Sequence, residues 1–423
     1  MGKDGKVPTE LGSPVSSLVE VGSAIVIIGA GPVGLSAALA VRATGRPVRV
    51  VEAEGAGRLR PGSRAIFIHK VTLEVLERIC PGLGHDLASR ALIWRTKRTF
   101  YRGRQVYHRT YPASVPGALP AAANLPQVLT EQILYDACVD AGVEFAWDSA
   151  VSRATGSADG VRLDLSDGST LDAGYAIGAD GSRSAVRETA GLQLEGPRTS
   201  NAFVIVDTAE DPADPLPRER VFHYEHPGAG CRNVLLVPFA GHWRVDLQCR
   251  LDDDADALSS SEGIRGWLPR VMPAKYADRV TWVSTYVFRQ AVANRFADAS
   301  RRILLAGEAG HVFAPFGARG LNSGIADAFV AAGAIDRALK ARSAADAATA
   351  IDDFEQARRA AALRNRAASS TAFEHLVASS LTTRVTRRVA GALAPSMPSV
   401  GRWMDSAAYG PVLQEPDRHG MHY

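Results

Sequence analysis

The chain has 423 residues, 46% of them hydrophobic and 22% charged, with a formal net charge of +3. These proportions exclude wholesale disorder and supply apolar side chains for about two or three structural units. Because 48 Lys and Arg residues nearly balance 45 Asp and Glu residues, the overall charge does not require nucleic acid or an anionic membrane as a partner. Four widely spaced cysteines without a CxxC pair argue against a disulfide framework and against a structural zinc site.

The predicted elements begin with a strand, a helix and a second strand. These follow a short tail at 1–22 and correspond to residues 24–28, 33–44 and 48–51. The uncharged stretch 23–41 is long enough to cross a bilayer, but glycines and a proline at 29–34 interrupt it. A strand, a turn and a helix therefore fit this stretch better than a membrane span does.

Helical and strand patterns alternate along the rest of the chain. Helices are expected at 73–79 and 129–141, and the alternation with Asp-Gly turn signals across 145–176 predicts an antiparallel meander. Further strands are expected at 203–206, 221–224, 234–237, 243–249, 280–288 and 303–306, followed by an Ala-rich helical stretch from 324 to about 370. This order predicts an α/β protein whose nucleotide-binding domain is interrupted by a strand-rich insertion.

A glycine-rich turn joins the first predicted strand to the first predicted helix. Its pattern is Gly29-x-Gly31-x-x-Gly34, and Glu52 ends the next strand 18 positions after Gly34. Such glycines permit a tight turn and a close approach of the backbone to a pyrophosphate at the helix N-terminus. A carboxylate at the end of the second strand accepts hydrogen bonds from both ribose hydroxyls and repels a 2′-phosphate, so the site favours FAD or NAD over NADP.

Two further segments place glycines after a predicted strand. One reads GADGSR over residues 178–183, and the other reads GEAGH over 307–311 and continues as PFGARGLN over 315–322. The latter segment places a second helix N-terminus where it can face an anion or an electron-rich ring. Glu308, a carboxylate at the end of a predicted strand, can accept hydrogen bonds from a polyol. Each segment taken alone is also compatible with an ordinary strand, turn and helix.

The three motifs in this order resemble those of the class A FAD-dependent monooxygenases, the aromatic-hydroxylase type, over residues 23–340. Segments 62–66 and 243–246 are similar to the 3-(3-hydroxyphenyl)propionate hydroxylase-like branch. The resemblance implies the p-hydroxybenzoate hydroxylase fold, an α/β fold in which a β-sheet substrate domain interrupts a Rossmann-like FAD-binding domain. The implied divisions are an N-terminal tail (1–22), the FAD-binding domain (23–195), the substrate-binding sheet (196–295), the return segment of the FAD-binding domain (296–340) and a C-terminal helical region (341–423), without the thioredoxin-like domain of many relatives.

The resemblance also assigns cofactor-binding residues. The ADP half of FAD is expected at Gly29, Gly31, Val33, Gly34 and Glu52, its pyrophosphate near Arg64, and its ribityl chain at Gln127 and Glu308. Asp180 is expected where flavin and nicotinamide nucleotide meet, Gly320, Leu321 and Asn322 beside the isoalloxazine, and Pro315 at the oxygen-reacting face. The family usually has Asp and Ala where this chain has Glu308 and Gly310, so the ribityl contact is expected to differ in detail.

The implied reaction is hydroxylation of an aromatic or polyketide-like small molecule with NAD(P)H and O2, through a flavin C4a-hydroperoxide. The cofactor carries that chemistry, while the protein orients the substrate and excludes water. No catalytic side chain is assigned, although His69, His223, His242 and Tyr286 have the chemical type to accept a phenolic proton, and no metal site is expected. Candidates to line the substrate pocket are His69, Phe203, Phe222, Tyr224, Phe239, Trp243 and Phe316.

Several alternatives remain open. The same fold performs epoxidation, Baeyer–Villiger oxidation, halogenation or reduction, although a Trp-x-Trp-x-Ile-Pro segment similar to that of halogenases is missing. A flavin-binding protein without turnover and a plain NAD-dependent dehydrogenase are two other classes. We expect a cytoplasmic monomer or homodimer that acts on a small aromatic molecule, without a nucleic-acid partner or a transmembrane segment. The basic cluster of Arg384, Arg387 and Arg388 is interpreted as a solvated helix face in preference to a lipophilic contact.

Overall fold

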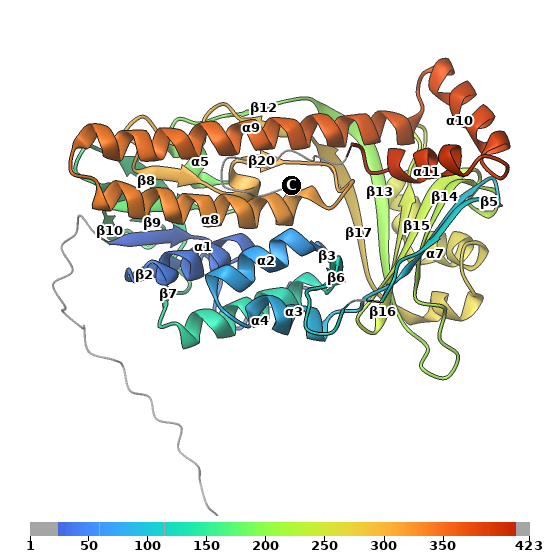
Figure 1. Ribbon diagram of the computed structural model, residues 1–423, viewed down its shortest axis with the longest axis horizontal. Coiled ribbons are helices and arrows are strands. Elements are labelled where there is room, and N and C mark those ends of the chain that lie inside the picture. Colours follow the sequence, from blue (N-terminus) through green and yellow to red (C-terminus); the bar gives the residue numbers. More distant parts are fainter. Residues whose placement is uncertain (1–23, 59, 114, 412–423) are drawn as a thin grey trace, which may run out of the picture.

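The computed structural model describes residues 24–411 except 59 and 114, so the predicted tail at 1–22 lies outside the described residues. Two sheets lie toward opposite ends of the long axis (Figure 1). The long helices α8 (Arg319–Lys340) and α9 (Ala344–Val377) lie along this axis, and α9 reaches both ends. None of the helices in the described part combines the length and apolarity that a membrane span requires.

A five-stranded parallel sheet contains the three predicted motifs. Its strands, in spatial order, are β19 (Ile303–Leu305), β11 (Tyr175–Gly178), β1 (Ile25–Ile28), β2 (Val48–Val51) and β7 (Glu144–Ala146). In the register of this sheet, Ile28 lies beside Val51 and Gly178, and Gly178 lies beside Leu305. Because the strands are parallel, the residues that follow these positions meet at one edge of the sheet.

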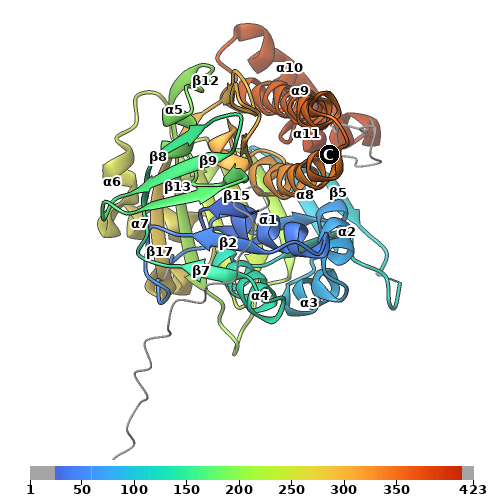
Figure 2. The ribbon, with the colours of Figure 1, turned by 90° about the vertical axis from the view of Figure 1, so that its left-hand side faces the viewer.

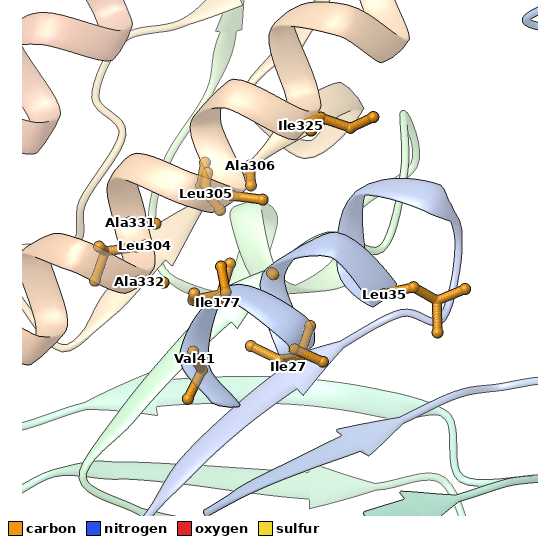
Figure 3. Packing of buried hydrophobic residues seen from close by; sticks show 14 of the residues in the cluster. Ile27, Leu35, Val41, Ile177, Leu304, Leu305, Ala306, Ile325, Ala331 and Ala332 are labelled. Carbon is orange, nitrogen blue, oxygen red and sulfur yellow. The ribbon is translucent and has the colours of Figure 1, made fainter. Parts of the chain in front are cut away.

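Helices cover this sheet because its strands are apolar on both faces. All four side chains of β1 are buried, as in parallel strands covered from both sides. Helix α1 (Pro32–Ala43) begins at a proline, whose fixed φ suits the first turn of a helix. Figure 3 shows Ile27, Ile177 and Leu304 from three strands packed with side chains of α1 and α8. Further helices around this core are α2 (Lys70–Ile79), α3 (Leu83–Arg90), α4 (Gln127–Asp140) and α5 (Ala185–Thr189).

A seven-stranded sheet forms the other end of the molecule. Its order is β17 (Val280–Arg289), β13 (Arg198–Ala209), β16 (His242–Gln248), β15 (Arg232–Phe239), β14 (Glu219–His226), β4 (Thr96–Tyr101) and β5 (Arg104–Thr110). Strands β4 and β5 fall inside the segment 23–195 that the sequence assigns to the first domain. They join the second sheet because β4 pairs in parallel with β14 and buries Thr99 and Tyr101. The short helices α6 (Ala255–Ser259) and α7 (Ser261–Trp267) belong to this end.

Three smaller sheets complete the fold, and Figure 2 shows one of them, β8 with β9, beside α5. The meander predicted at 145–176 is shorter than expected, because its two ends join the parallel sheet as β7 and β11. The small sheets are β8 (Val151–Gly156) with β9 (Val161–Leu165) and β10 (Thr170–Ala173); β12 (Leu194–Glu195) with β18 (Ala291–Ala293) and β20 (His311–Val312); and β3 (Phe67–His69) with β6 (Ala122–Asn124). Two C-terminal helices, α10 (Leu381–Leu393) and α11 (Pro398–Ala407), pack at the end of the seven-stranded sheet.

Candidate functional site

The three glycine-rich turns that follow β1, β11 and β19 are called here the glycine corners. They meet at the carboxyl edge of the parallel sheet. The backbone N–H of Gly29 donates to Val51 (2.8 Å), that of Ala179 to Ile28 (2.8 Å), and that of Ala306 to Gly178 (2.9 Å). Each bond joins the first residue after one strand (β1, β11 or β19) to the last residue of the neighbouring strand. The sequence predicted three separate turns, and the structure brings them together in one place.

Glycine is required at Gly29 by both conformation and space. Its φ is +101°, and a Cβ built there would lie 2.5 Å from the carbonyl oxygen of Ala179. A Cβ at Gly34 would lie 1.8 Å from the Gly29 carbonyl oxygen. The backbone of α1 therefore lies directly against the strand ends. No side chain caps the first turn of α1, so its N–H groups are available to an anion.

We expect Gly29→Ala to lower the free energy of unfolding by about 1–3 kcal/mol more than Gly45→Ala does. Gly45, at the C-terminal end of α1, has a φ of +82° but no atom within 4 Å of a built Cβ. Both variants carry the strain of a left-handed backbone, and only Gly29→Ala adds the contact with Ala179. Urea denaturation of the two variants measures the difference, and equal losses would contradict the close approach.

The carboxylate of Glu52 lies beside this corner and is buried, with 4% of the residue exposed. It accepts hydrogen bonds from the backbone N–H groups of Ala30 (2.6 Å) and Glu54 (3.2 Å). The guanidinium groups of Arg58 and Arg60 each approach it to 3.5 Å. Sequence reasoning missed both arginines, although their position shortly after Glu52 was a signal. Glu54 pairs with the same two arginines, so the rim of this corner is a network of two arginines and two glutamates.

Arg64 lies on a loop that the second sheet holds in place. Its φ is +47°, and its carbonyl oxygen accepts a hydrogen bond from Arg244 on β16 (2.5 Å). The preceding N–H, that of Ser63, donates to the buried Asp207 on β13 (2.6 Å). The side-chain oxygen of Gln127 accepts from the N–H of Ala65 (3.3 Å). Gln127 therefore supports the Arg64 loop from the start of α4.

Glu308 lies close enough to Arg64 for the two charges to interact. Its side chain is exposed to solvent, yet burial raises the pKa of its carboxyl, with His311 and Arg64 acting in the opposite direction. Tyr286 of β17 lies nearby: burial, with a contribution from Glu308, raises the pKa of its phenol to about 12. The structure thus brings together three residues that the sequence had named separately.

Asp180 contacts the first turn of the short helix α5, whose N-cap is Ser184. Its Oδ2 accepts a hydrogen bond from the N–H of Val186 (3.1 Å). Burial raises the pKa of this carboxyl, although Ser184, Val186 and Arg187 favour its charged form. The buried Arg187 donates to the carbonyl oxygens of Ala309 and Ser182 (3.2 Å each), which ties the second motif to the third.

The side-chain amide of Asn322 on α8 uses its hydrogen bonds to hold the start of α8 against β3 and α2. Its Oδ1 accepts from the N–H of His69 (2.9 Å) and the hydroxyl of Thr72 (2.7 Å), and its Nδ2 donates to the carbonyls of Phe67 (2.9 Å) and Ala318 (2.7 Å). The first turn of α8, with Gly320 and Leu321, has no side-chain cap, so its backbone N–H groups are available.

His69 lies against the same turn. Its Nε2 lies 3.0 Å from the carbonyl oxygen of Gly317. Burial lowers the pKa of His69, the bond to Gly317 opposes this effect, and Arg319 adds to it. Pro315 is exposed at the turn that precedes α8. Pro315 therefore belongs to the segment that leads into α8, and His69, at the end of β3, contacts this segment through Gly317.

The predicted pocket residues separate into different clusters. Phe203, Phe222, Tyr224 and Phe316 pack in one aromatic cluster, with Tyr286 at its border. Trp243 lies in another hydrophobic cluster, where its indole N–H donates to Glu210 (2.8 Å), and Phe239 lies in a third. The two remaining histidines stack on aromatic rings, His223 on Phe100 and His242 on Phe239.

The Tyr224 hydroxyl is already used within the aromatic cluster. It donates to the carbonyl oxygen of Met404 (2.7 Å) and lies 3.1 Å from the His375 ring nitrogen. Tyr224 therefore supports the cluster from within. Among the residues that the structure describes, no group of three or more His, Cys, Asp and Glu side chains is arranged to hold a metal ion.

Comparisons with known proteins identify the family of this site. The family model described as "FAD binding domain" matches residues 23–369. The chain is 35% identical over 318 residues to 6-methylpretetramide 4-monooxygenase of Streptomyces rimosus, an alignment that covers 73% of this chain and 54% of that protein. It is 27% identical to a 3-(3-hydroxy-phenyl)propionate/3-hydroxycinnamic acid hydroxylase of Mycolicibacterium smegmatis, over 72% of this chain and 53% of that protein. The chain thus spans about half the length of these curated relatives.

A solved structure shares the whole architecture. The p-nitrophenol 4-monooxygenase PnpA of Pseudomonas putida DLL-E4 matches with a TM-score of 0.74 and 24% identity, over 91% of this chain and 98% of that one. At this identity the likeness establishes the fold. The resemblance drawn from the three glycine motifs is confirmed by the family match, and the chain belongs to the FAD-binding domain family of the class A flavoprotein monooxygenases.

Proposed function

We propose that the chain is a monooxygenase that uses FAD, NAD(P)H and O2 to hydroxylate an aromatic or polyketide-like small molecule. The observation that best supports this proposal is the arrangement at one edge of the parallel sheet. The three glycine corners meet there with Glu52, Arg64 and Glu308, next to an aromatic cluster. The similarity to a 6-methylpretetramide 4-monooxygenase supports the reaction class. Bound FAD would supply the chemistry: NAD(P)H provides two electrons, one atom of O2 enters the substrate, and the other leaves as water.

The chain's own residues fit the charged half of FAD. The uncapped N–H groups of α1 and the side chain of Arg64 would bind the two phosphates, and the Glu52 carboxylate would accept hydrogen bonds from the adenosine ribose. Glu308 would bind a ribityl hydroxyl. Its side chain is one methylene longer than that of the Asp usual in the family and is exposed to solvent, so we expect the ribityl contact to differ in detail.

The aromatic cluster would form the substrate side of the site. Phe203 and Phe316 are buried there with ring centroids 5.8 Å apart, and Tyr286 extends the cluster toward Glu308. Such apolar surroundings exclude water and hold a flat ring by its faces and edges. The Tyr286 phenol is protonated at neutral pH and would donate a hydrogen bond to the substrate.

We expect Arg64→Ala to weaken FAD binding by about tenfold, and this effect should shrink as salt is added, because a charge-assisted contact to phosphate is screened. Titration of flavin-free protein with FAD at two ionic strengths measures it. Arg153→Ala, which removes an exposed arginine from β8, is the control and should leave the affinity unchanged. Wild-type affinity of Arg64→Ala at every ionic strength would contradict this role.

A turnover screen tests the function itself. FAD-loaded protein is supplied with NADPH or NADH and a panel of phenols, quinones and polycyclic aromatic compounds, in the presence of isotopically labelled O2. Substrate-dependent NAD(P)H consumption with labelled oxygen in the product would support hydroxylation. Flavin retention without any substrate-stimulated consumption would favour a flavin-binding protein without turnover, and a colourless protein unable to bind FAD would favour a dehydrogenase.

A further inference from the structure

The exposed apolar side chains of this protein are concentrated at one end. Of the eleven large hydrophobic side chains exposed in the described part of the chain, six lie between residues 381 and 403. Four of these recur at every fourth residue along α10, so they share one face of the helix. Figure 1 shows α10 at the end of the molecule opposite the parallel sheet. The six residues, called here the apolar stripe, are Leu381, Val385, Val389, Leu393, Met397 and Trp403.

The opposite face of α10 is fixed to the protein, which keeps the apolar stripe outward. The buried guanidinium of Arg387 donates to Glu225 (2.9 Å) and to two carbonyl oxygens at the end of α9. A Cβ built on Gly391 would lie 2.3 Å from the ring of Tyr101, so the helix lies directly against β4. Rotating α10 to bury its apolar stripe would break this buried ion pair and this close contact.

Basic side chains border the apolar stripe. Arg384 and Arg388 are exposed and lie one helical turn apart beside it. Residues 375–404 contain no Asp or Glu. The acidic Glu225 beneath the helix is already paired with Arg102 and Arg387. The local charge of this face is therefore positive, although the chain as a whole is nearly neutral.

A groove next to the apolar stripe continues the positive charge. It has a volume of ≈ 610 Å³ and lies between β5 and the turn that joins α10 to α11. His108, Arg109 and Arg402 line it, and none of its lining residues is acidic. A groove of this kind accepts a phosphate-bearing group beside a surface that accepts hydrocarbon.

We propose that α10 and this groove form a docking surface for an anionic lipid bilayer. A helix with one apolar face and arginines along its border lies in the interface of such a bilayer, with its apolar side chains among the acyl chains. Trp403, 41% exposed, is a residue type enriched at this depth. A second copy of the chain fits less well, because a two-fold contact would place the arginines of both copies against each other. The interpretation of the basic cluster as a solvated face is wrong for Arg387, which is buried, whereas Arg384 and Arg388 are exposed as expected.

Flotation of the FAD-loaded chain with vesicles tests the proposal. We expect binding to vesicles of equimolar phosphatidylcholine and phosphatidylglycerol, and little binding to phosphatidylcholine alone. Arg384→Gln/Arg388→Gln should lower the partition coefficient roughly 30-fold, from about 1 kcal/mol for each arginine. Val389→Gln should lower it about tenfold, and glutamine preserves the helix. Added salt should weaken the binding of the unmodified chain.

Matched controls separate this face from the rest of the surface. Val139→Gln removes a valine that is 50% exposed on α4, against 51% for Val389, and Arg153→Gln/Arg342→Gln removes the same charge elsewhere. Neither control should change vesicle binding. Equal binding to both vesicle types, no binding to anionic vesicles, or equal losses in the controls would overturn the proposal. So would a Val389→Gln chain that changes from dimer to monomer with unchanged vesicle binding.

Discussion

Replacing Asp327 by alanine is expected to lower the free energy of unfolding by about 3–5 kcal/mol, because it removes one carboxylate from a fully buried charged network. Asp327 of α8 accepts hydrogen bonds from the Arg358 guanidinium on α9 (2.7 Å), the His311 ring (2.7 Å) and the backbone N–H of Gly307 (3.0 Å). The side chains of Asp327, Arg358 and His311 are all fully buried. Urea denaturation followed by circular dichroism measures the loss.

Asp336→Ala is the matched control on the same helix. Asp336 pairs with Arg46 and Lys340 near the surface, where such pairs contribute about 0–1 kcal/mol. A loss in Asp327→Ala no larger than that in Asp336→Ala would show that the buried network does not hold α8, α9 and the third glycine motif together.

The stabilisation by Asp327 should also depend on pH. Burial opposes its ionisation, but Arg358 and His311 outweigh burial and hold the pKa of this carboxyl below its usual range. A carboxyl with a depressed folded-state pKa stabilises the protein above its unfolded-state pKa of about 3.9 and loses that contribution as the pH falls further. The difference between the unmodified chain and Asp327→Ala should therefore be constant from neutral pH down to about pH 5 and shrink below it.

Glu52→Ala should raise the dissociation constant for FAD by about 100-fold, which corresponds to the loss of one or two hydrogen bonds to a charged group. The carboxylate lies at the end of β2, and its removal also leaves Arg58 and Arg60 without this partner. Fluorescence titration of flavin-free protein measures the constant, and circular dichroism of the same sample checks that the fold is retained.

Glu54→Ala is the control for Glu52→Ala. It removes a negative charge beside the same arginines but not the carboxylate that we expect to bind the ribose. Glu54 pairs with the same two arginines, but its side chain is 53% exposed. We expect its removal to change FAD affinity by less than about threefold. If both variants lost affinity equally, electrostatics of the rim would explain the effect and the predicted role of Glu52 would be wrong.

The local pattern of the chain was enough to place the glycine site. Strand β2 begins and ends at the predicted residues, and β1 and α1 agree with prediction to within one residue at each end. These elements depend on features that are close together in sequence: β-branched runs, an Ala-rich helix, and glycines at fixed spacing. The family followed from three such motifs in one order.

Contacts between distant segments determined the remainder. The composition of residues 91–123 indicates only exposed strands and loops, and the pairing of β4 with β14 is what assigns residues 96–110 to the second sheet. Arg58 and Arg60 pair with Glu52 only because the loop after β2 folds back toward its carboxylate. Trp243 and Phe222 were equal candidates by type, and the structure places them in different hydrophobic clusters.

By itself, the sequence determined the glycine-rich turn between β1 and α1 and the order of the elements, because those follow from backbone propensity and hydrophobic period over a few residues. The tertiary structure alone decided which face of α10 is outward, which arginines reach Glu52, and how Asp327 joins two helices to the third motif. Such choices depend on burial and charge pairing between residues that are tens to hundreds of positions apart, and no local pattern records them.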